Sequence, residues 1–299
     1  MVHYYKCPLC NSEDTGAWLQ VPDYFLTGEK FELVRCPNCG FLFTQDHPDI
    51  EEIGRYYESA DYISHNDSAG GISASIYRIA REFMLKRKRK MVCRVSGLDK
   101  GSILDIGSGT GHFLSVMKNG GWQVKGTEIN DKAREFSKTE FGLEVLPPVN
   151  IGSLPSASFD AISLWHVLEH FQDPFTYASE IKRLLKPGGV CLIALPNCSS
   201  FDAGFYKISW AAYDVPRHLW HFTPATFKLF AEKNGFIIRS VRALPLDVFY
   251  ISILSEKYKK TGFSFMQGIL KGALFYLLSL FNMKGSSSLI YQLQKTIDQ

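Results

Sequence analysis

The stretch Ile103-Leu104-Asp105-Ile106-Gly107-Ser108-Gly109-Thr110-Gly111-His112-Phe113-Leu114 decides the fold. Its first part is apolar apart from one acid, which predicts a strand buried on both faces in a parallel sheet. Three alternating glycines follow, and they permit a sharp turn and let a ligand touch the backbone where a Cβ would collide. A helix is expected after Gly111, and its first N–H groups would face that ligand. The segment therefore predicts the strand, turn and helix of an α/β ligand-binding fold.

Two classes of ligand use such a turn: dinucleotides and S-adenosylmethionine. The dinucleotide fingerprint G-x-G-x-x-G requires a glycine where this chain has His112. The carboxylate of Asp105 would repel a pyrophosphate but suits the ammonium group of a methionine moiety. The run L-D-I-G-S-G-T-G-H-F resembles motif I of the class I S-adenosylmethionine-dependent methyltransferases. A nicotinamide-dependent oxidoreductase stays open as an alternative, which the acid and the glycine spacing disfavour.

The resemblance implies a seven-stranded Rossmann-like sheet whose last strand is antiparallel. Ser287–Leu293 suits that last strand, and the other expected strands after motif I are Trp122–Ile129, Glu144–Leu146, Phe159–Leu164, Val190–Leu195 and Phe236–Ala243. We expect three parts: a small ribbon over residues 1–48, a linker with helices over 49–100, and a methyltransferase domain over 101–299. Within the last part, 198–222 and 244–285 are expected to be insertions.

The same resemblance predicts the cofactor site. Asp105 and the glycine turn would hold the methionine part, and Glu128 would accept hydrogen bonds from the ribose hydroxyls. Asn150 would accept a hydrogen bond from the adenine amino group through its side-chain carbonyl. The ligands of an open parallel sheet lie beyond the carboxyl ends of its strands, where Trp165 emerges. The expected contacts are Asp105, Gly107, Ser108, Gly109, Gly111, Glu128, Ile129, Asn150, Ile151 and Trp165.

Three histidines are candidates for a catalytic base, because the unperturbed pKa of an imidazole lies near neutrality. His218 is the leading candidate and His221 the second, since both lie in a loop at the functional edge of the sheet. It is equally open that they only brace that loop. His166, beside Trp165, is the third candidate. Glu169 and His170 look like a metal pair, but no third ligand stands near them, so we expect His170 to order its loop.

The cysteines predict a zinc ribbon. Cys7 and Cys10 form one C-x-x-C pair, and Cys36 and Cys39 form another. Four thiolates close a tetrahedron around zinc with no open position, so the ion would be structural. The total of seven cysteines is odd, and no leader-like segment precedes them. These features favour metal binding in a reducing cytoplasm over disulfides.

Charge and hydrophobicity limit the partners. The net charge of +3 is too slight to predict nucleic-acid binding, and the basic run Lys86–Lys90 is expected to be a solvated helix face. The apolar run Ala273–Phe281 is shorter than the ~20 residues that span a bilayer. It predicts either a lid helix or, over residues 265–283, a peripheral contact with the inner face of a membrane.

The acceptor stays open at this stage. The ribbon and the core together are similar to bacterial methyltransferases that modify sugars and small molecules. That similarity implies O- or C-methylation of a small molecule, a saccharide, or a glycan or lipid-linked compound. A catalytically silent methyltransferase fold that serves as a scaffold is the alternative, and the sequence does not fix the oligomeric state.

Overall fold

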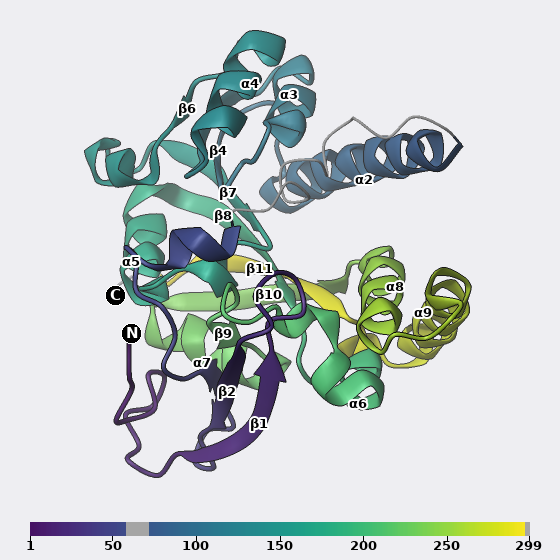
Figure 1. Ribbon diagram of the computed structural model, residues 1–299. Helices are drawn as coiled ribbons and strands as arrows, with labels where there is room; N and C mark the ends of the chain where they lie inside the picture. Colours follow the sequence, from purple (N-terminus) through teal and green to yellow (C-terminus); the bar gives the residue numbers. More distant parts are fainter. Residues whose placement is uncertain (58–71, 297–299) are drawn as a thin grey trace.

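The structure is a computed structural model that describes residues 1–57 and 72–296, with side chains from residue 79 onward in the second range. Its centre is a seven-stranded sheet in the order β10-β11-β8-β7-β4-β5-β6 (Figure 1). Six strands point the same way, and β11 alone runs in the opposite direction, antiparallel to both β8 and β10. The expected α/β fold with an antiparallel last strand is confirmed. The strands are β4 (Ser102–Ile106), β5 (Gln123–Thr127), β6 (Val145–Leu146), β7 (Phe159–Trp165), β8 (Leu185–Pro196), β10 (Phe236–Ala243) and β11 (Ser288–Lys295).

Helices cover both faces of this sheet. Ile103 on β4 packs with α2 (Ile72–Ser96) and α3 (His112–Asn119), whereas its neighbour Leu104 faces the side of α5 (Pro174–Leu184) and α7 (Pro224–Lys233). This alternation is the period-two pattern of a strand that is buried on both faces. The remaining short helices near the sheet are α4 (Asp131–Phe141), η1 (Ile53–Tyr57), η2 (Pro148–Ser153) and η3 (Leu168–His170). Residues 58–71 of the expected linker lie outside the described residues.

A second sheet joins the N-terminal residues to the rest of the chain. Its order is β1 (Gly16–Pro22), β2 (Lys30–Arg35), β3 (Leu42–Thr44) and β9 (Trp220–His221). The fourth strand comes from the segment 198–222, which we expected to be only a connection. That segment also forms α6 (Phe201–Tyr206), η4 (Lys207–Ser209) and η5 (Ala211–Tyr213). A two-residue strand carries too little periodicity to be read from sequence, which is why β9 was missed.

The segment between β10 and β11 is a helical hairpin. Here α8 (Asp247–Tyr258) packs along α9 (Ser264–Phe281), and η6 (Met283–Gly285) leads into β11 (Figure 1). Gly268 and Gly272 permit the close contact, because a Cβ on Gly268 would lie 2.5 Å from Ile253 Cα. The 18-residue α9 is twice as long as the apolar run noted in the sequence. Within the described residues it is the one helix long and apolar enough to cross a bilayer, and only 17% of it is buried.

Candidate cofactor and acceptor site

Asp105 lies at the centre of the candidate site. Its side chain is buried on β4 with 2% exposure, and Oδ1 accepts a hydrogen bond from Ser163 Oγ at 2.6 Å. Burial raises the pKa of Asp105 to about 7, although the Ser163 hydrogen bond and the charge of Lys88 oppose that rise. A buried carboxylate of this kind gains most when a cation lies against it. The position therefore suits the ammonium group of a methionine moiety.

The glycine turn after β4 leaves open space beside its backbone. The N–H groups of Gly107 and Ser108 both donate to Thr127 O, which fixes the turn against β5. A Cβ on Gly107 would lie 2.5 Å from Val167 Cγ2, so only glycine fits there. Gly109 has φ +55, and an added Cβ would meet nothing within 4 Å. Ser108 Oγ is buried without a hydrogen-bond partner among the described residues. An open cradle with an orphaned hydroxyl fits a bound nucleoside.

Glu128 connects this turn to the end of β5. One carboxylate oxygen accepts from Gly109 N at 2.8 Å and the other from Asn130 N at 2.9 Å. A carboxylate accepts about four hydrogen bonds, so capacity remains for two ribose hydroxyls. Next to it, Ile129 is 71% exposed, while Ile151 is 8% exposed within the core. Asn150 is exposed on η2. The structure thus brings Asp105, the glycine turn and Glu128 to one edge of the sheet.

Lys88 is a residue of this site that the sequence analysis missed. Its Nζ lies 4.3 Å from the centre of the Trp165 ring. Burial lowers the pKa of Lys88, while the charges of Asp105 and Asp247 oppose that shift. The basic run around it was expected to be solvated. Helical spacing in the sequence could have shown this, because Lys88 lies four residues before the buried Val92 and therefore on the same face of α2.

His166 stands at the tip of β7 between two carboxylates. Nε2 lies 2.8 Å from Asp247 Oδ2, and Nδ1 lies 3.5 Å from Glu169 Oε1. Burial alone would lower the pKa of His166, but the hydrogen bond and charge of Asp247, together with Glu169, raise it to about 9. Its backbone has φ 60, a left-handed conformation that costs energy for a residue with a Cβ. Strain of this kind concentrates at functional sites.

The other two candidate bases lie in different surroundings. His218 Nδ1 is 2.8 Å from Ala212 O, and its ring packs on His170 with 4.5 Å between ring centres. Burial, with the charge of His218, lowers the pKa of His170 to about 4. His221 instead lies buried on β9, 3.0 Å from Thr44 Oγ1, and burial lowers its pKa to about 3. The structure brings His166 and His218 toward Glu169, and it places His221 in the second sheet.

One expectation about this region needs correction. We expected no third ligand near Glu169 and His170. In the structure one ligand atom from each of Glu169, His170 and His218 lies within 4.8 Å of the other two. His218 is distant in sequence, and the loop that carries it is folded back by β9. Sequence spacing alone therefore could not show this group of side chains.

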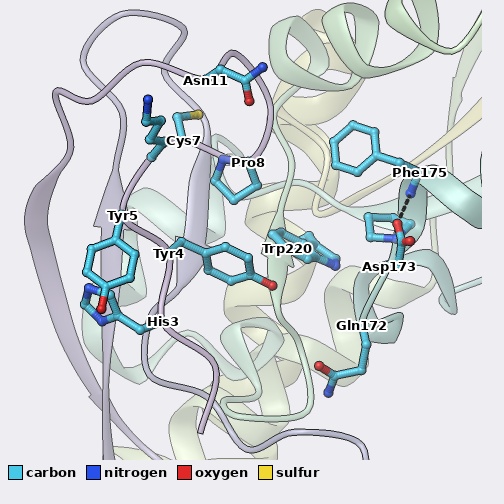
Figure 2. A pocket seen from close by; sticks show the side chains of 12 residues that line it. His3, Tyr4, Tyr5, Cys7, Pro8, Asn11, Gln172, Asp173, Phe175 and Trp220 are labelled. Carbon is cyan, nitrogen blue, oxygen red and sulfur yellow. Dashed lines mark hydrogen bonds between the residues drawn. The ribbon is translucent and has the colours of Figure 1, made fainter.

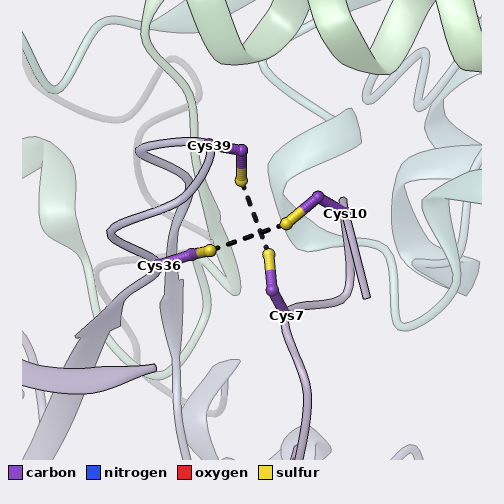
Figure 3. Close-up of side chains that lie close together, drawn as sticks. All are labelled: Cys7, Cys10, Cys36 and Cys39. Carbon is purple, nitrogen blue, oxygen red and sulfur yellow. Dashed lines mark hydrogen bonds between the residues drawn. The ribbon is translucent and has the colours of Figure 1, made fainter. Parts of the chain in front are cut away.

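The four paired cysteines converge on one point (Figure 3). Cys7 Sγ lies 3.6 Å from Cys39 Sγ, and Cys10 Sγ lies 3.6 Å from Cys36 Sγ. The sulfur atoms of a tetrahedral tetrathiolate site lie roughly 3.8 Å apart, given Zn–S bonds of about 2.3 Å. The arrangement can therefore hold a metal ion without rearrangement of the chain.

Two surface cavities lie away from this edge of the sheet. One of about 490 Å³ lies between the N-terminal residues and the start of α5, and Tyr4, Asp173 and Trp220 contribute to its wall (Figure 2). Another of about 640 Å³ lies between α4 and β6. Neither cavity is lined by Asp105 or Glu128. The carboxyl edge of the sheet is the candidate site because Asp105, the glycine turn and Glu128 fit the groups of S-adenosylmethionine, and not because a large cavity lies there.

Comparisons with known proteins agree with this geometry. A family model described as a methyltransferase domain matches residues 78–241. The chain is 25% identical over 191 residues to a probable S-adenosylmethionine-dependent methyltransferase of Mycolicibacterium smegmatis, covering 62% of this chain and 68% of that protein. It is 24% identical over 180 residues to the ubiquinone biosynthesis O-methyltransferase of Alkalilimnicola ehrlichii, and the match covers 56% of this chain and 71% of that protein.

A solved structure shares the fold. It is a sarcosine dimethylglycine methyltransferase candidate from Galdieria sulphuraria, 14% identical, with a TM-score of 0.50 and coverage of 73% of this chain and 86% of that one. The family match begins in α2, includes the glycine turn and Glu128, and ends in β10. It covers more than half of the 299 residues. The chain therefore belongs to the methyltransferase-domain family and is an S-adenosylmethionine-dependent methyltransferase.

Proposed function

We propose that this methyltransferase methylates a hydroxyl group of a small apolar acceptor that it meets at a membrane surface. One observation carries the proposal. Asp247, which binds His166 at the tip of β7, is the first residue of α8, and α8 packs along the exposed apolar helix α9. A single hairpin therefore connects the acceptor side of the site to a surface suited to lipid.

The cofactor supplies an electrophilic methyl group on a sulfonium, and the chain binds and orients it. Asp105 would hold the ammonium group, and Glu128 the ribose hydroxyls. Ile129, Asn150 and Ile151 would surround the adenine, with Trp165 beyond the tip of β7. His166, which Asp247 keeps protonated, would stabilise the ionised form of the acceptor hydroxyl, whose proton goes to solvent. Aligning the reacting atoms and excluding water is the main contribution a protein makes to such a transfer.

The outer face of α9 has the composition of a lipid-binding surface. Each of the following large apolar side chains is more than half exposed: Phe265, Met266, Leu270, Leu274, Leu277, Leu280 and Phe281. Exposed lysines flank the hairpin at Lys257, Lys259, Lys260 and Lys284. The two acids between residues 244 and 296 are both paired, Asp247 with His166 and Glu256 with Lys271. An apolar face with an uncompensated basic rim is complementary to anionic lipid.

The acceptor class follows from this surface. A compound with an apolar tail would reach the site from the bilayer, with its hydroxyl-bearing head toward His166. The similarity to a ubiquinone biosynthesis O-methyltransferase supports transfer of the methyl group to an oxygen atom. Water-soluble saccharides and carbon acceptors are the other outcomes that the assay must separate.

The test compares two acceptors that differ only in the tail. A phenolic head group with and without an isoprenoid chain is incubated with methyl-labelled cofactor and anionic vesicles, and label transferred to oxygen is measured. We expect the tailed acceptor to be methylated at least tenfold faster. Equal rates for both acceptors, or label found on carbon or on saccharides only, would contradict the proposal.

A vesicle assay tests the surface separately. Leu274→Glu combined with Leu277→Glu should abolish flotation with anionic vesicles, because two charges then enter the apolar face. Leu98→Glu, a similar change at an exposed leucine outside the hairpin, should float like the unmodified chain. Flotation of the double variant would count against a lipid surface, and so would failure of the unmodified chain to float.

We also propose that Cys7, Cys10, Cys36 and Cys39 hold a structural zinc ion, which the convergence of their sulfur atoms supports. Elemental analysis should find one zinc bound by these four thiolates in each chain. Removing it with a strong chelator should lower the melting temperature, because the thiolates cross-link the segment before β1 to the turn between β2 and β3. An unchanged melting temperature after complete removal would contradict a structural ion.

A further inference from the structure

We propose that Glu169, His170 and His218 form a second metal site, which binds a divalent transition-metal ion beside the acceptor. The three side chains come from two distant segments. Glu169 and His170 lie on η3 directly after β7, and His218 lies in the loop before β9. One ligand atom from each lies within 4.8 Å of the other two.

Glu169 is the strongest indication of a missing cation. Its side chain is 1% exposed, and neither carboxylate oxygen has a hydrogen-bond partner among the described residues. The approach of His166 Nδ1 to Oε1, at 3.5 Å, is longer than an ordinary hydrogen bond. Buried carboxylates are normally paired, hydrogen-bonded or bound to a metal. His166 contributes a positive charge at 3.5 Å, and an ion between Glu169 and the two imidazoles would add the short contacts that the carboxylate oxygens lack.

The two histidines are oriented as metal ligands usually are. His170 Nδ1 lies 3.1 Å from Arg217 O, and His218 Nδ1 lies 2.8 Å from Ala212 O. A carbonyl oxygen can only accept, so Nδ1 of His218 carries the proton and its Nε2 keeps its lone pair. Nδ1 of His170 also lies 3.1 Å from the Tyr57 hydroxyl, which can donate or accept, and the carbonyl of Arg217 favours the same tautomer. Backbone carbonyls commonly fix ligating histidines in this way. A fourth group lies at the edge, since Asp214 Oδ2 is 3.9 Å from His218 Nε2.

The donor set selects the class of ion. Two imidazole nitrogens and one carboxylate suit Mn²⁺, Fe²⁺, Co²⁺ or Zn²⁺, whereas Mg²⁺ and Ca²⁺ prefer oxygen ligands alone. Three protein ligands also leave open positions, unlike the group of four cysteines. An acceptor hydroxyl could take one of them, and the ion would then lower the pKa of that hydroxyl. This effect on the acceptor rests on the proposed function, whereas ion binding itself does not.

Manganese binding to the full chain tests the site directly. The chain is given one equivalent of zinc, which the four thiolates take up first, and is then titrated with Mn²⁺ while the electron paramagnetic resonance signal of free Mn²⁺ is recorded. Thiolates bind Mn²⁺ poorly, so the cysteines do not compete. We expect one equivalent to bind, and Glu169→Gln and His218→Gln each to weaken binding at least tenfold. His3→Gln removes a histidine from an exposed pair with Asp46 and should leave binding unchanged.

Several outcomes separate this site from the proposed function. Retained affinity for S-adenosylmethionine shows that a variant is folded, and Glu169→Asp, which keeps the charge, should bind Mn²⁺ more tightly than Glu169→Gln. No Mn²⁺ binding to the unmodified chain, or equal binding to Glu169→Gln, would overturn the site even if methyl transfer continues. Binding of Mn²⁺ without any methylation of the tailed acceptor would support the site and reject the acceptor.

Discussion

Asp105 is the residue on which cofactor recognition depends most. It is buried at the carboxyl end of β4, and burial raises its pKa to about 7. An ammonium group placed against Asp105 would favour the ionised carboxylate, and the ionised carboxylate would in turn bind the ammonium group most strongly. Lys88 supplies a positive charge nearby, and that charge favours the ionised form of Asp105 even without the ligand. The charge state of one side chain is therefore linked to cofactor affinity.

This linkage predicts a pH dependence for cofactor binding. Below pH 7 Asp105 becomes protonated and neutral, so the affinity for S-adenosylmethionine should fall between pH 7 and pH 5, by up to roughly tenfold per pH unit. The ammonium group itself stays charged throughout this range. Asp105→Asn should bind more weakly at pH 7 and lose most of the dependence. Calorimetric titrations at several pH values would measure the affinity for S-adenosylmethionine. An affinity of the unmodified chain that does not change with pH would contradict the prediction.

At the residue scale the sequence was informative where chemistry is local. Asp105, the glycines and Glu128 lie within 24 residues, and their spacing predicted the edge they share. His218 and Glu169 are brought together only by a long loop, so their contact was invisible to spacing. Lys88 was hidden by neighbouring charges that do face solvent.

At the scale of elements, the contact between α8 and α9 depends on glycine. A Cβ on Gly268 would lie 2.5 Å from Ile253 Cα, and one on Gly272 would lie 2.9 Å from Phe249 Cδ1. The spacing of these glycines allows two backbones to approach closely, as in helix pairs packed within membranes. The sequence predicted an apolar helix in this insertion. It did not predict the hairpin, because packing against α8 is a tertiary property.

A matched pair of substitutions tests this contact. Gly268→Ala should destabilise the protein by about 1–3 kcal/mol, because the added methyl group pushes on backbone atoms that cannot move freely. Gly204→Ala in α6 adds the same group where nothing lies within 4 Å, and should be neutral or stabilising by about 0.5–1 kcal/mol. Urea unfolding would measure both. Equal effects of the two substitutions would show that α8 and α9 do not pack this closely.

At the scale of the whole molecule, a buried ion pair fastens the N-terminal sheet to the methyltransferase core. Arg217 Nη2 lies 2.7 Å from Asp23 Oδ1, with 1% and 0% of the two side chains exposed. Burial would raise the pKa of Asp23, but the hydrogen bond and charge of Arg217, together with the hydrogen bonds from Thr27, outweigh burial and lower the pKa. The strand β9 adds a second link between the two parts. The N-terminal sheet is therefore structurally continuous with the loop that carries His218.

Neutralising this pair predicts a global loss of stability. Asp23→Asn should cost about 1.5–3 kcal/mol at pH 7, the range for a hydrogen bond to a charged group. Because the pKa of Asp23 is lowered on folding, its contribution exists above its unfolded pKa and is lost as the pH falls below about 4. The difference from the unmodified chain should therefore shrink in acid. Asp46→Asn, at an exposed pair, should change stability by less than about 0.5 kcal/mol.

The architecture was more predictable than the way its parts connect. The central sheet follows from runs of apolar residues and from the glycine turn, whose physical causes are local. The ribbon cysteines were found by spacing, and their convergence in the structure fits that prediction. The joining of two sheets by β9 depends on a two-residue strand and one buried pair. Such features arise from packing between distant segments, for which sequence pattern carries little signal.

The central claim is that Asp105, the glycine turn and Glu128 together bind S-adenosylmethionine. Calorimetry with the demethylated cofactor, on the zinc-loaded chain, tests it most directly. We predict one binding site, at least tenfold weaker in Glu128→Gln and unchanged in Glu140→Gln, a substitution on the exposed face of α4. No binding to the unmodified chain, or equal affinity in Glu128→Gln, would contradict the account.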